Sequence, residues 1–159
     1  METPIIKGIS FQTLLLRNNK ISTVSGIEYL SLTGLYLAEN EIQNLIGIDV
    51  LVNLSRLHLR GNPLTDLEGF TRINRNLGYL NLRECSITQV QQLEKITLLK
   101  GLKTLVLRDN PFNYRCGREE DARFRIQILL LLPSLTRIDK NKVSSEEYVQ
   151  ATRIHYAGI

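Results

Sequence analysis

The 159-residue sequence contains no tryptophan, one methionine and only two cysteines, and aromatic residues make up 6% of it. Two cysteines cannot build the disulfide framework of a small secreted domain, so we expect a reduced, cytosolic protein. A transmembrane helix is not expected, because the longest apolar run, Ile126–Leu132, contains Gln127 and is stopped by Pro133. The first ten residues include Glu2 and Pro4, so we expect neither a signal peptide nor a membrane partner.

The common sequence motifs of enzymes and metal sites are missing as well. The sequence has no glycine-rich phosphate-binding loop, no HExxH and no CxxC. Its two histidines, His58 and His155, and its two cysteines, Cys85 and Cys116, do not have the spacing of a zinc site. We therefore expect a non-enzymatic protein with no metal and no cofactor.

The remaining composition is that of an ordinary folded domain. Apolar residues make up 43% of the chain and charged residues 23%, and the mean hydropathy is −0.09. Twenty basic and 16 acidic residues give a net charge of +4. Because residues of both signs are interspersed, this small excess does not indicate a nucleic-acid-binding surface.

One repeated pattern of leucines decides the fold. It reads apolar-x-x-Leu-x-Leu-x-x-(Asn/Cys)-x-apolar, and its Asn/Cys positions follow one another at steps of 21, 22, 23 and 25 residues. This period is typical of a leucine-rich repeat solenoid. We predict an α/β horseshoe with a parallel concave sheet, short helical or 3₁₀ returns on the convex side, and a C-terminal helical cap. The five segments are Phe11–Ile21, Leu32–Ile42, Leu54–Leu64, Leu77–Ile87 and Leu102–Phe112.

Each part of the repeat has a physical reason. The Leu-x-Leu alternation predicts a short strand with one buried face. The asparagine after the strand turns inward, where its amide can satisfy backbone groups of its own turn and of the next one. Apolar residues then recur at steps of three, which suits a 3₁₀-like return. The predicted structural ladder consists of Asn19, Asn40, Asn62, Cys85 and Asn110.

Both ends of a solenoid core need a cover. We expect a partial N-terminal cap over residues 1–10, five repeats over 11–113, a C-terminal cap over 114–140 and a tail over 141–159. The N-terminal cap has few apolar side chains with which to cover the core, since Ile5, Ile6 and Ile9 are its only large apolar residues besides Met1.

The C-terminal cap is predicted to be a helix over Glu119–Leu132 that ends at Pro133. A final edge strand is expected over Leu135–Ile138. In the tail, Ser144 and Glu147 have the spacing of a capping box, so a short helix should begin near residue 145 and either fold back on the cap or extend to a partner. The apolar stripe of the cap helix is predicted to contain Ala122, Ile126, Leu129 and Leu130, widened by Phe124, Ile128 and Leu131.

The strand positions that point away from the core form the candidate site. We interpret them as a docking face for a helix or an extended segment of a protein partner, because Tyr and Arg are enriched at binding hot spots. In the alternative interpretation, the arginines and the neighbouring acids Glu39, Glu84 and Asp109 form a self-neutralising, solvated ladder. The candidate partner-binding residues are Tyr36, Arg56, His58, Arg60, Tyr79, Arg83 and Arg108.

Two other uses of this face are disfavoured. Direct RNA binding would suit tyrosines and arginines, but an acidic file lies beside the basic one. Catalysis by a Cys85–His58 pair is excluded by the repeat, which turns Cys85 into the core and His58 to the opposite face.

The repeat length and the cap resemble the cytosolic class of leucine-rich repeat proteins related to the phosphatase regulator. This class includes the spliceosomal A-prime protein, acidic nuclear phosphoproteins and an axonemal dynein light chain. The cap residues that carry the resemblance are Phe124-Arg125, Ile128-Leu129, Leu132-Pro133, Leu135, Ile138 and Asp139.

The segment Leu57–Lys140 resembles more specifically the C-terminal repeats of the family of leucine-rich repeat-containing protein 23, a radial-spoke component of motile cilia. The resemblance implies a protein-interaction scaffold of the axonemal radial spoke, in the cytoplasm and the cilium or flagellum. The alternative is a generic cytosolic or nuclear scaffold, either phosphatase-regulator-like or a partner of a splicing protein.

Overall fold

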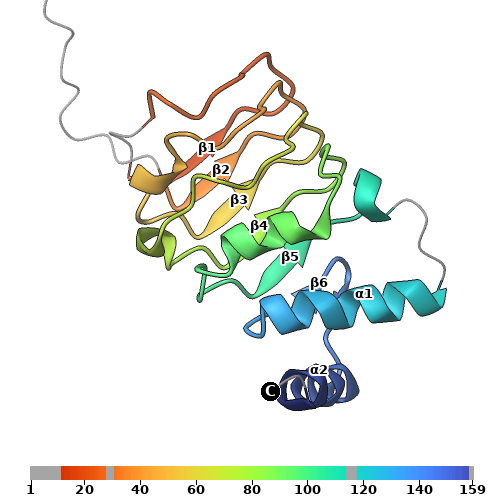
Figure 1. Cartoon of the computed structure of the whole chain (residues 1–159). Helices are drawn as coiled ribbons and strands as arrows, with labels where there is room; N and C mark the ends of the chain where they lie inside the picture. Colours follow the sequence, from red (N-terminus) through yellow and green to blue (C-terminus); the bar gives the residue numbers. More distant parts are fainter. Residues whose placement is uncertain (1–11, 28–30, 114–117, 158–159) are drawn as a thin grey trace, which may run out of the picture.

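The computed structural model describes residues 12–27, 31–113 and 118–157. Within them, seven short strands form one sheet in which the strand order follows the chain (Figure 1). Strands β1 to β6 are parallel, and β7 pairs with β6 in the antiparallel direction. The strands are β1 (Thr13–Leu15), β2 (Gly34–Tyr36), β3 (Arg56–His58), β4 (Tyr79–Asn81), β5 (Thr104–Val106), β6 (Arg137–Ile138) and β7 (Asn141–Lys142).

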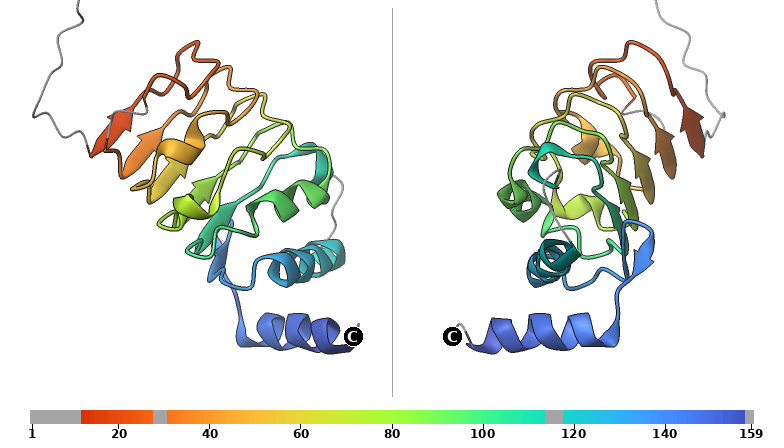
Figure 2. Two further views of the ribbon diagram at one scale, coloured as in Figure 1. Left: turned by 60° about the vertical axis from the view of Figure 1, so that its left-hand side comes forward. Right: turned by 90° about the vertical axis from the view of Figure 1, so that its right-hand side faces the viewer.

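The return segments lie on the side opposite the sheet (Figure 2). Among the described residues, three returns contain 3₁₀ segments, as the three-residue spacing predicts, the third being a longer helix of seven residues, and a fourth 3₁₀ segment follows β5. This is the architecture of the predicted leucine-rich repeat horseshoe. The 3₁₀ segments are η1 (Ile48–Val50), η2 (Arg72–Asn74), η3 (Val90–Ile96) and η4 (Pro111–Asn113).

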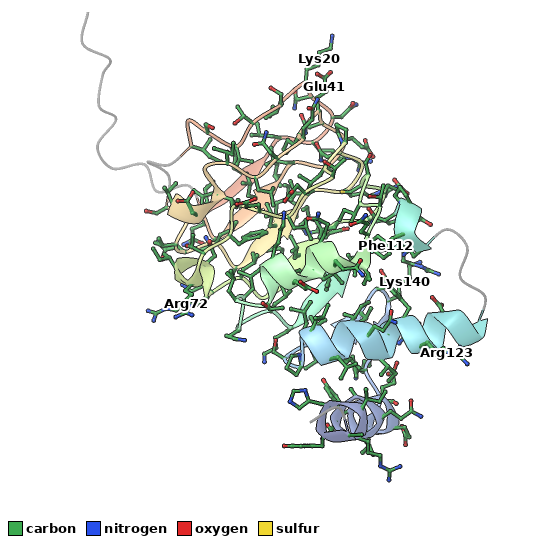
Figure 3. The ribbon with its side chains drawn as sticks, in the orientation of Figure 1. Lys20, Glu41, Arg72, Phe112, Arg123 and Lys140 are labelled. Atoms are coloured by element: carbon green, nitrogen blue, oxygen red, sulfur yellow. The ribbon has the colours of Figure 1, made fainter. Side chains whose placement is uncertain are left out.

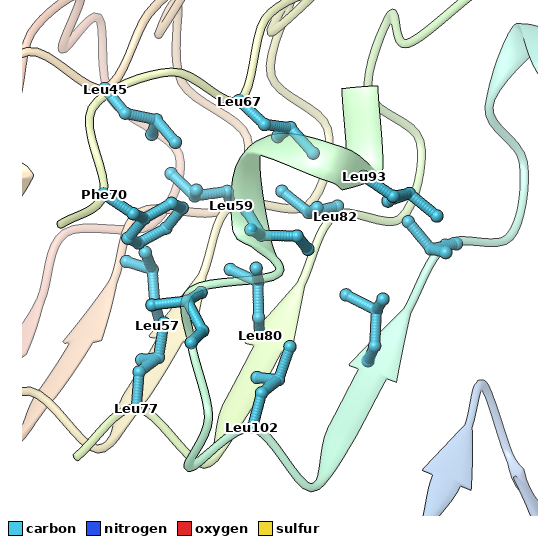
Figure 4. Packing of buried hydrophobic residues seen from close by; sticks show 14 of the residues in the cluster. Leu45, Leu57, Leu59, Leu67, Phe70, Leu77, Leu80, Leu82, Leu93 and Leu102 are labelled. Atoms are coloured by element: carbon cyan, nitrogen blue, oxygen red, sulfur yellow. The ribbon is translucent and has the colours of Figure 1, made fainter. Parts of the chain in front are cut away.

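Leucines from successive repeats stack into one continuous core between the sheet and the returns (Figure 4). The central residues of the strands, Leu35, Leu57, Leu80 and Leu105, are each 0% exposed and pair in register along the sheet. Full burial of such a side chain contributes about 1.5–3 kcal/mol. The core is therefore a row of equivalent layers and not a single centre.

Buried asparagines connect these layers. The Asn62 amide donates to the carbonyls of Leu37 (2.9 Å) and Leu59 (2.8 Å), and its Oδ1 accepts from the Ile42 N–H (3.0 Å). Asn40 and Asn110 make the equivalent three bonds in their own repeats. Each of these side chains thus satisfies its own turn and the turn of the preceding repeat.

The first and fourth ladder positions differ from this pattern. Asn19 is exposed, and among the described residues it donates within its own turn, to the carbonyls of Leu16 (3.0 Å) and Arg17 (3.1 Å). Cys85 is buried, and its thiol reaches the Leu59 carbonyl at 3.4 Å. Burial raises the pKa of this thiol to about 12, so Cys85 stays protonated and serves as a weak hydrogen-bond donor.

The C-terminal cap begins with helix α1 (Arg118–Leu131), within one residue of its predicted bounds. Ile126, Ile128 and Leu129 are buried against the last repeat. The predicted apolar stripe is wrong at Ala122, which is exposed because it precedes the part of the helix that contacts the core.

The predicted final edge strand is also wrong in detail. Only Arg137–Ile138 form β6, and β7 covers its outer side, so β6 is an inner strand. At the turn between them Asp139 has a φ of 55°, and its Oδ1 accepts from the N–H groups of Leu107 (2.8 Å) and Arg108 (3.0 Å). In the earlier repeats, the N–H equivalent to that of Leu107 donates to a backbone carbonyl of the next repeat. The Asp139 carboxylate replaces that carbonyl after the last repeat strand.

Helix α2 (Ser145–Ala157) follows β7 and packs on α1, so the tail folds back on the cap (Figure 1). Ser144 and Glu147 form the predicted capping box, with the Ser144 N–H donating to Glu147 at 2.7 Å and the Glu147 N–H to Ser144 at 3.2 Å. Glu147 also accepts from Arg125 of α1 at 3.1 Å, and the Tyr148 hydroxyl donates to the Leu135 carbonyl. These contacts join α2 to residues of the cap, which follow the repeats in the chain.

The N-terminal cap residues Ile5, Ile6 and Ile9 lie outside the described residues, as does Cys116. Among the helices that the structure describes, none has the length and apolar character to cross a membrane.

We expect Asn62→Ala to lower the free energy of unfolding by at least about 1–3 kcal/mol, because it leaves buried backbone groups in two repeats without partners. Asn19→Ala is the matched control and should cost less, since water reaches the carbonyls that Asn19 contacts. Urea denaturation followed by circular dichroism measures both. Equal losses of unfolding free energy in the two variants would contradict the role of Asn62 in connecting successive repeats.

Asp139→Ala should also destabilise the protein, because the two N–H groups lose their acceptor and alanine is placed at a positive φ. Burial raises the pKa of Asp139, so its charged form is disfavoured in the folded state. Asp139→Asn keeps the acceptor, tolerates the positive φ and removes the buried charge. We expect its thermal midpoint at neutral pH to equal or exceed that of the wild type; a loss as large as that of Asp139→Ala would contradict this role.

Candidate interaction surface

Three rings stack on the exposed face of the sheet. The ring centroids of Tyr36 on β2 and His58 on β3 lie 4.3 Å apart with an interplanar angle of 18°. His58 and Tyr79 on β4 follow at 4.7 Å and 27°. These separations match the strand spacing of about 4.8 Å. The parallel register therefore positions the stack.

The stack depends on neighbouring residues of the same face. Tyr36 and His58 pair directly in register, whereas Tyr79 is opposite Arg56, so its ring reaches diagonally towards His58. The Tyr36 ring extends over Gly34, where an added Cβ would lie 3.3 Å from Tyr36 Cε2. The added Cβ would lie equally close to the Thr13 hydroxyl, so a side chain at position 34 would require the Tyr36 ring and Thr13 to shift slightly. The sequence offered no clear sign of that requirement.

Arg56 and His58 give the stack its electrostatic character. The Arg56 guanidinium carbon lies 5.0 Å from the centroid of the Tyr79 ring, which is a cation–π distance. Burial, and secondarily the charge of Arg56, lowers the pKa of His58, and burial raises the pKa of Tyr79. Within the described residues, the buried Nε2 of His58 has no hydrogen-bond partner. At neutral pH this site thus contains an uncharged imidazole whose Nε2 is enclosed in the stack.

Beside the stack, the arginines of one repeat pair with acidic residues of the next. Arg60 donates to Glu84 at 2.9 and 3.1 Å, and Arg83 donates to Asp109 at 2.7 Å. The acids lie at a positive φ, 54° for Glu84 and 62° for Asp109, three residues after the end of each strand. Arg17 and Glu39 form the same pair at 2.7 Å near the N-terminal edge.

The predicted partner-binding residues thus fall into two groups. Tyr36, His58, Tyr79 and Arg56 come together in one cluster, which we call the aromatic cluster. Arg60 and Arg83 form ion pairs with acids of the next repeat, and we call this series of pairs the ion-pair ladder. It is the geometry that the alternative interpretation, a self-neutralising ladder of arginines and acids, predicts. Arg108 is exposed, and its side chain makes no ion pair with any residue that the structure describes.

The ion-pair ladder has one interruption, and it lies beside the aromatic cluster. The arginine position is Ala38 in the second repeat, and the acidic position is Gly61 in the third. Gly61 has a φ of 69°, so the turn is the same while the side chains are missing. The small residues leave this side of the cluster without an ion pair, an interruption that sequence reasoning did not identify.

No catalytic arrangement emerges from Cys85 and His58. The Cys85 thiol points into the core, whereas His58 is part of the cluster on the opposite face. In the part of the chain that the structure describes, no group of three or more His, Cys, Asp or Glu side chains could hold a metal ion.

Comparisons with known proteins support the family assignment. No family model matches the chain. Leucine-rich repeat-containing protein 23 of Xenopus tropicalis is 42% identical over 110 residues, which cover 69% of this chain and 30% of that protein. The Bos taurus protein of the same name is 38% identical over 148 residues, which cover 93% of this chain and 42% of that protein. The chain therefore spans less than half of the length of these relatives.

Among solved structures, the fold is similar to a chain in the crystal structure of the Drosophila melanogaster SNF/U2A' complex. The TM-score is 0.75 at 20% identity, and the match covers 92% of this chain and 86% of that chain. At this identity the likeness shows the fold alone.

The His58 environment can be tested by NMR titration. We expect its imidazole to titrate below the ordinary pKa of about 6.5, and Arg56→Ala to move the midpoint up, because a nearby positive charge is removed. Since the folded pKa is lowered, the free energy of unfolding should fall as the pH drops from the ordinary pKa of about 6.5 through the lower pKa of the folded state. Arg75→Ala, a change on the convex side, should leave the midpoint unchanged. An Arg56→Ala midpoint equal to that of the wild type would contradict the coupling.

Proposed function

Because the chain is a leucine-rich repeat protein that resembles leucine-rich repeat-containing protein 23 over part of that protein's length, we propose that it is a non-enzymatic scaffold that binds a protein segment on its concave face. The aromatic cluster is the observation that carries this proposal. Three stacked rings on an exposed sheet offer a preformed contact area that requires little ordering on binding.

The chemistry of the cluster suits a polypeptide partner. Tyrosine combines a large apolar surface with a polar end, and such residues dominate binding hot spots. The His58 ring lies between the two tyrosine rings and extends the same contact area. A helix or an extended segment laid across the strands would contact all three rings.

The arginines have graded roles in this proposal. Arg56 is held against Tyr79 and orients that ring. Arg60 and Arg83 are paired already, so a partner would gain less from them than from a free charge. Arg108, which makes no ion pair with the described residues, can pair with a carboxylate of the partner. Charges of this kind mainly steer association and fix orientation.

The cellular setting that fits the resemblance is the axonemal radial spoke, in the cytoplasm and the cilium or flagellum. The named relatives support this setting, and the repeats and cap suit a structural component. The alternative is a generic cytosolic or nuclear scaffold, including a phosphatase-regulator-like protein or a partner of a splicing protein. Both assignments rest on protein binding and involve neither direct nucleic-acid contact nor a cofactor.

A tagged copy expressed in ciliated cells tests the setting and the surface together. We expect retention on detergent-extracted axonemes, and we expect Tyr36→Ala combined with Tyr79→Ala to reduce it through lost contact area, with little change in melting temperature. Tyr156→Ala is the matched control, because Tyr156 is a 71% exposed tyrosine on α2.

Two outcomes would contradict the proposal. Nuclear staining without axonemal retention would favour the nuclear alternative. Full retention of the double variant, together with loss in the Tyr156→Ala control, would move the binding surface to the tail helix.

A further inference from the structure

A second exposed surface lies at the edge of the solenoid where the returns of the second and third repeats lead back to the strands. Three aliphatic side chains are exposed there, Val50 by 45%, Val52 by 42% and Ile73 by 57%. Arg72 and Arg75 belong to the same surface, and both are exposed. We call these five residues the convex patch. Figure 3 shows Arg72 projecting away from the ribbon at this place.

The convex patch is held rigidly by hydrogen bonds between successive returns. The Asn74 amide is buried and donates to the Ile48 carbonyl at 3.0 Å, and its Oδ1 accepts from the Thr71 N–H at 2.9 Å. The Asn76 amide donates to the Val52 carbonyl at 2.9 Å. A partner would thus meet a preformed surface, which lowers the ordering cost of association.

A shallow pocket lies between the two returns. Its volume is about 380 Å³. Aliphatic and arginine side chains line it together, so apolar contact and positive charge are offered at the same place. The lining residues are Val52, Asn53, Arg72, Ile73, Arg75 and Asn76.

The charge of the convex patch is not neutralised locally. Arg60 and Arg83 on the other face are in ion pairs, whereas Arg72 and Arg75 have none with the residues that the structure describes. Lys100 follows at the position of Arg75 one repeat further on, and it is exposed too. Asp49 borders the patch but lines the neighbouring pocket with Asp66 and Glu68.

We propose that the convex patch is a second docking site, and that its occupant is an acidic, aliphatic-rich segment of a protein partner. Carboxylates of such a segment would pair with Arg72 and Arg75 while its aliphatic side chains cover Ile73 and Val52. Single-stranded RNA is a poorer fit, because stacking needs aromatic side chains and the pocket lining has none. With the concave site, this patch lets one scaffold hold two segments at once.

The proposal is independent of the concave site, and the test separates the two. The probe is a fluorescein-labelled helical peptide of about five turns with leucines on one face and glutamates on the other. The second probe is the same peptide with lysine in place of glutamate. Fluorescence anisotropy gives the affinity, and ¹⁵N chemical-shift changes of the full chain locate the contact.

We expect the acidic peptide to bind and to shift resonances of residues 50–53 and 72–76, with little binding of the lysine peptide. Arg72→Glu combined with Arg75→Glu should weaken binding by about tenfold or more, because attraction becomes repulsion. Ile73→Ser should weaken it separately. Arg123→Glu with Arg153→Glu is the matched control on α1 and α2 and should have little effect, as should Tyr36→Ala with Tyr79→Ala.

Several results would overturn the proposal. These are an absence of binding, equal weakening by the control pair, or shifts centred on the aromatic cluster. Tighter binding of oligouridine or of phosphatidylserine vesicles at residues 72–76 would replace the protein segment with RNA or a membrane surface. Melting curves of each variant separate a lost contact from a lost fold.

Discussion

The hydrogen bonds of the buried turn side chains are the constraint on which this solenoid depends. Asn62 reaches the carbonyls of Leu37 and Leu59 in two successive repeats, which fixes the turn after one strand relative to the turn after the preceding strand. A fixed turn sets the parallel register, and the register stacks the leucines of the core. In the fourth repeat the ladder position is occupied by Cys85, whose thiol is a weak donor, so the ladder continues through that repeat without a break.

The same turn positions two rows of charged residues on the sheet side, one of arginines and one of acids. The residue before the ladder position lies at a positive φ, and in three repeats it is an acid that reaches the arginine of the preceding repeat. Backbone conformations of this type cost free energy in residues other than glycine, of order 1–3 kcal/mol. The ion pairs offset part of that cost. Where Ala38 and Gly61 replace the pair, the ion-pair ladder is interrupted beside the aromatic cluster.

The C-terminal end of the sheet needs a different solution, because in the described chain β6 is followed by β7 and α2 instead of another repeat. Asp139 supplies a carboxylate acceptor to the last turn, β7 covers the outer side of β6, and α1 covers the core. Helix α2 is joined to this cap by Arg125 and Glu147. Both partners are largely buried, and the pKa of Glu147 is lowered chiefly by its hydrogen bond to Arg125. The tail is therefore part of the cap and not a free extension.

The sequence by itself determined the repeat register, the parallel sheet, the core leucines and the inward position of Asn62, because period and side-chain chemistry are local properties that recur along the chain. It also indicated the row of arginines, the neighbouring row of acids and the residues of the aromatic cluster. It could not determine that Arg60 and Arg83 are in ion pairs whereas Arg72 and Arg75 make none with the residues that the structure describes, that Tyr79 leans towards His58, or that Ala122 is exposed. Those outcomes depend on distances between residues of different repeats and on where the cap helix meets the core. Only the tertiary structure decides them, because stacking brings together side chains more than 20 positions apart and sets which of them meet.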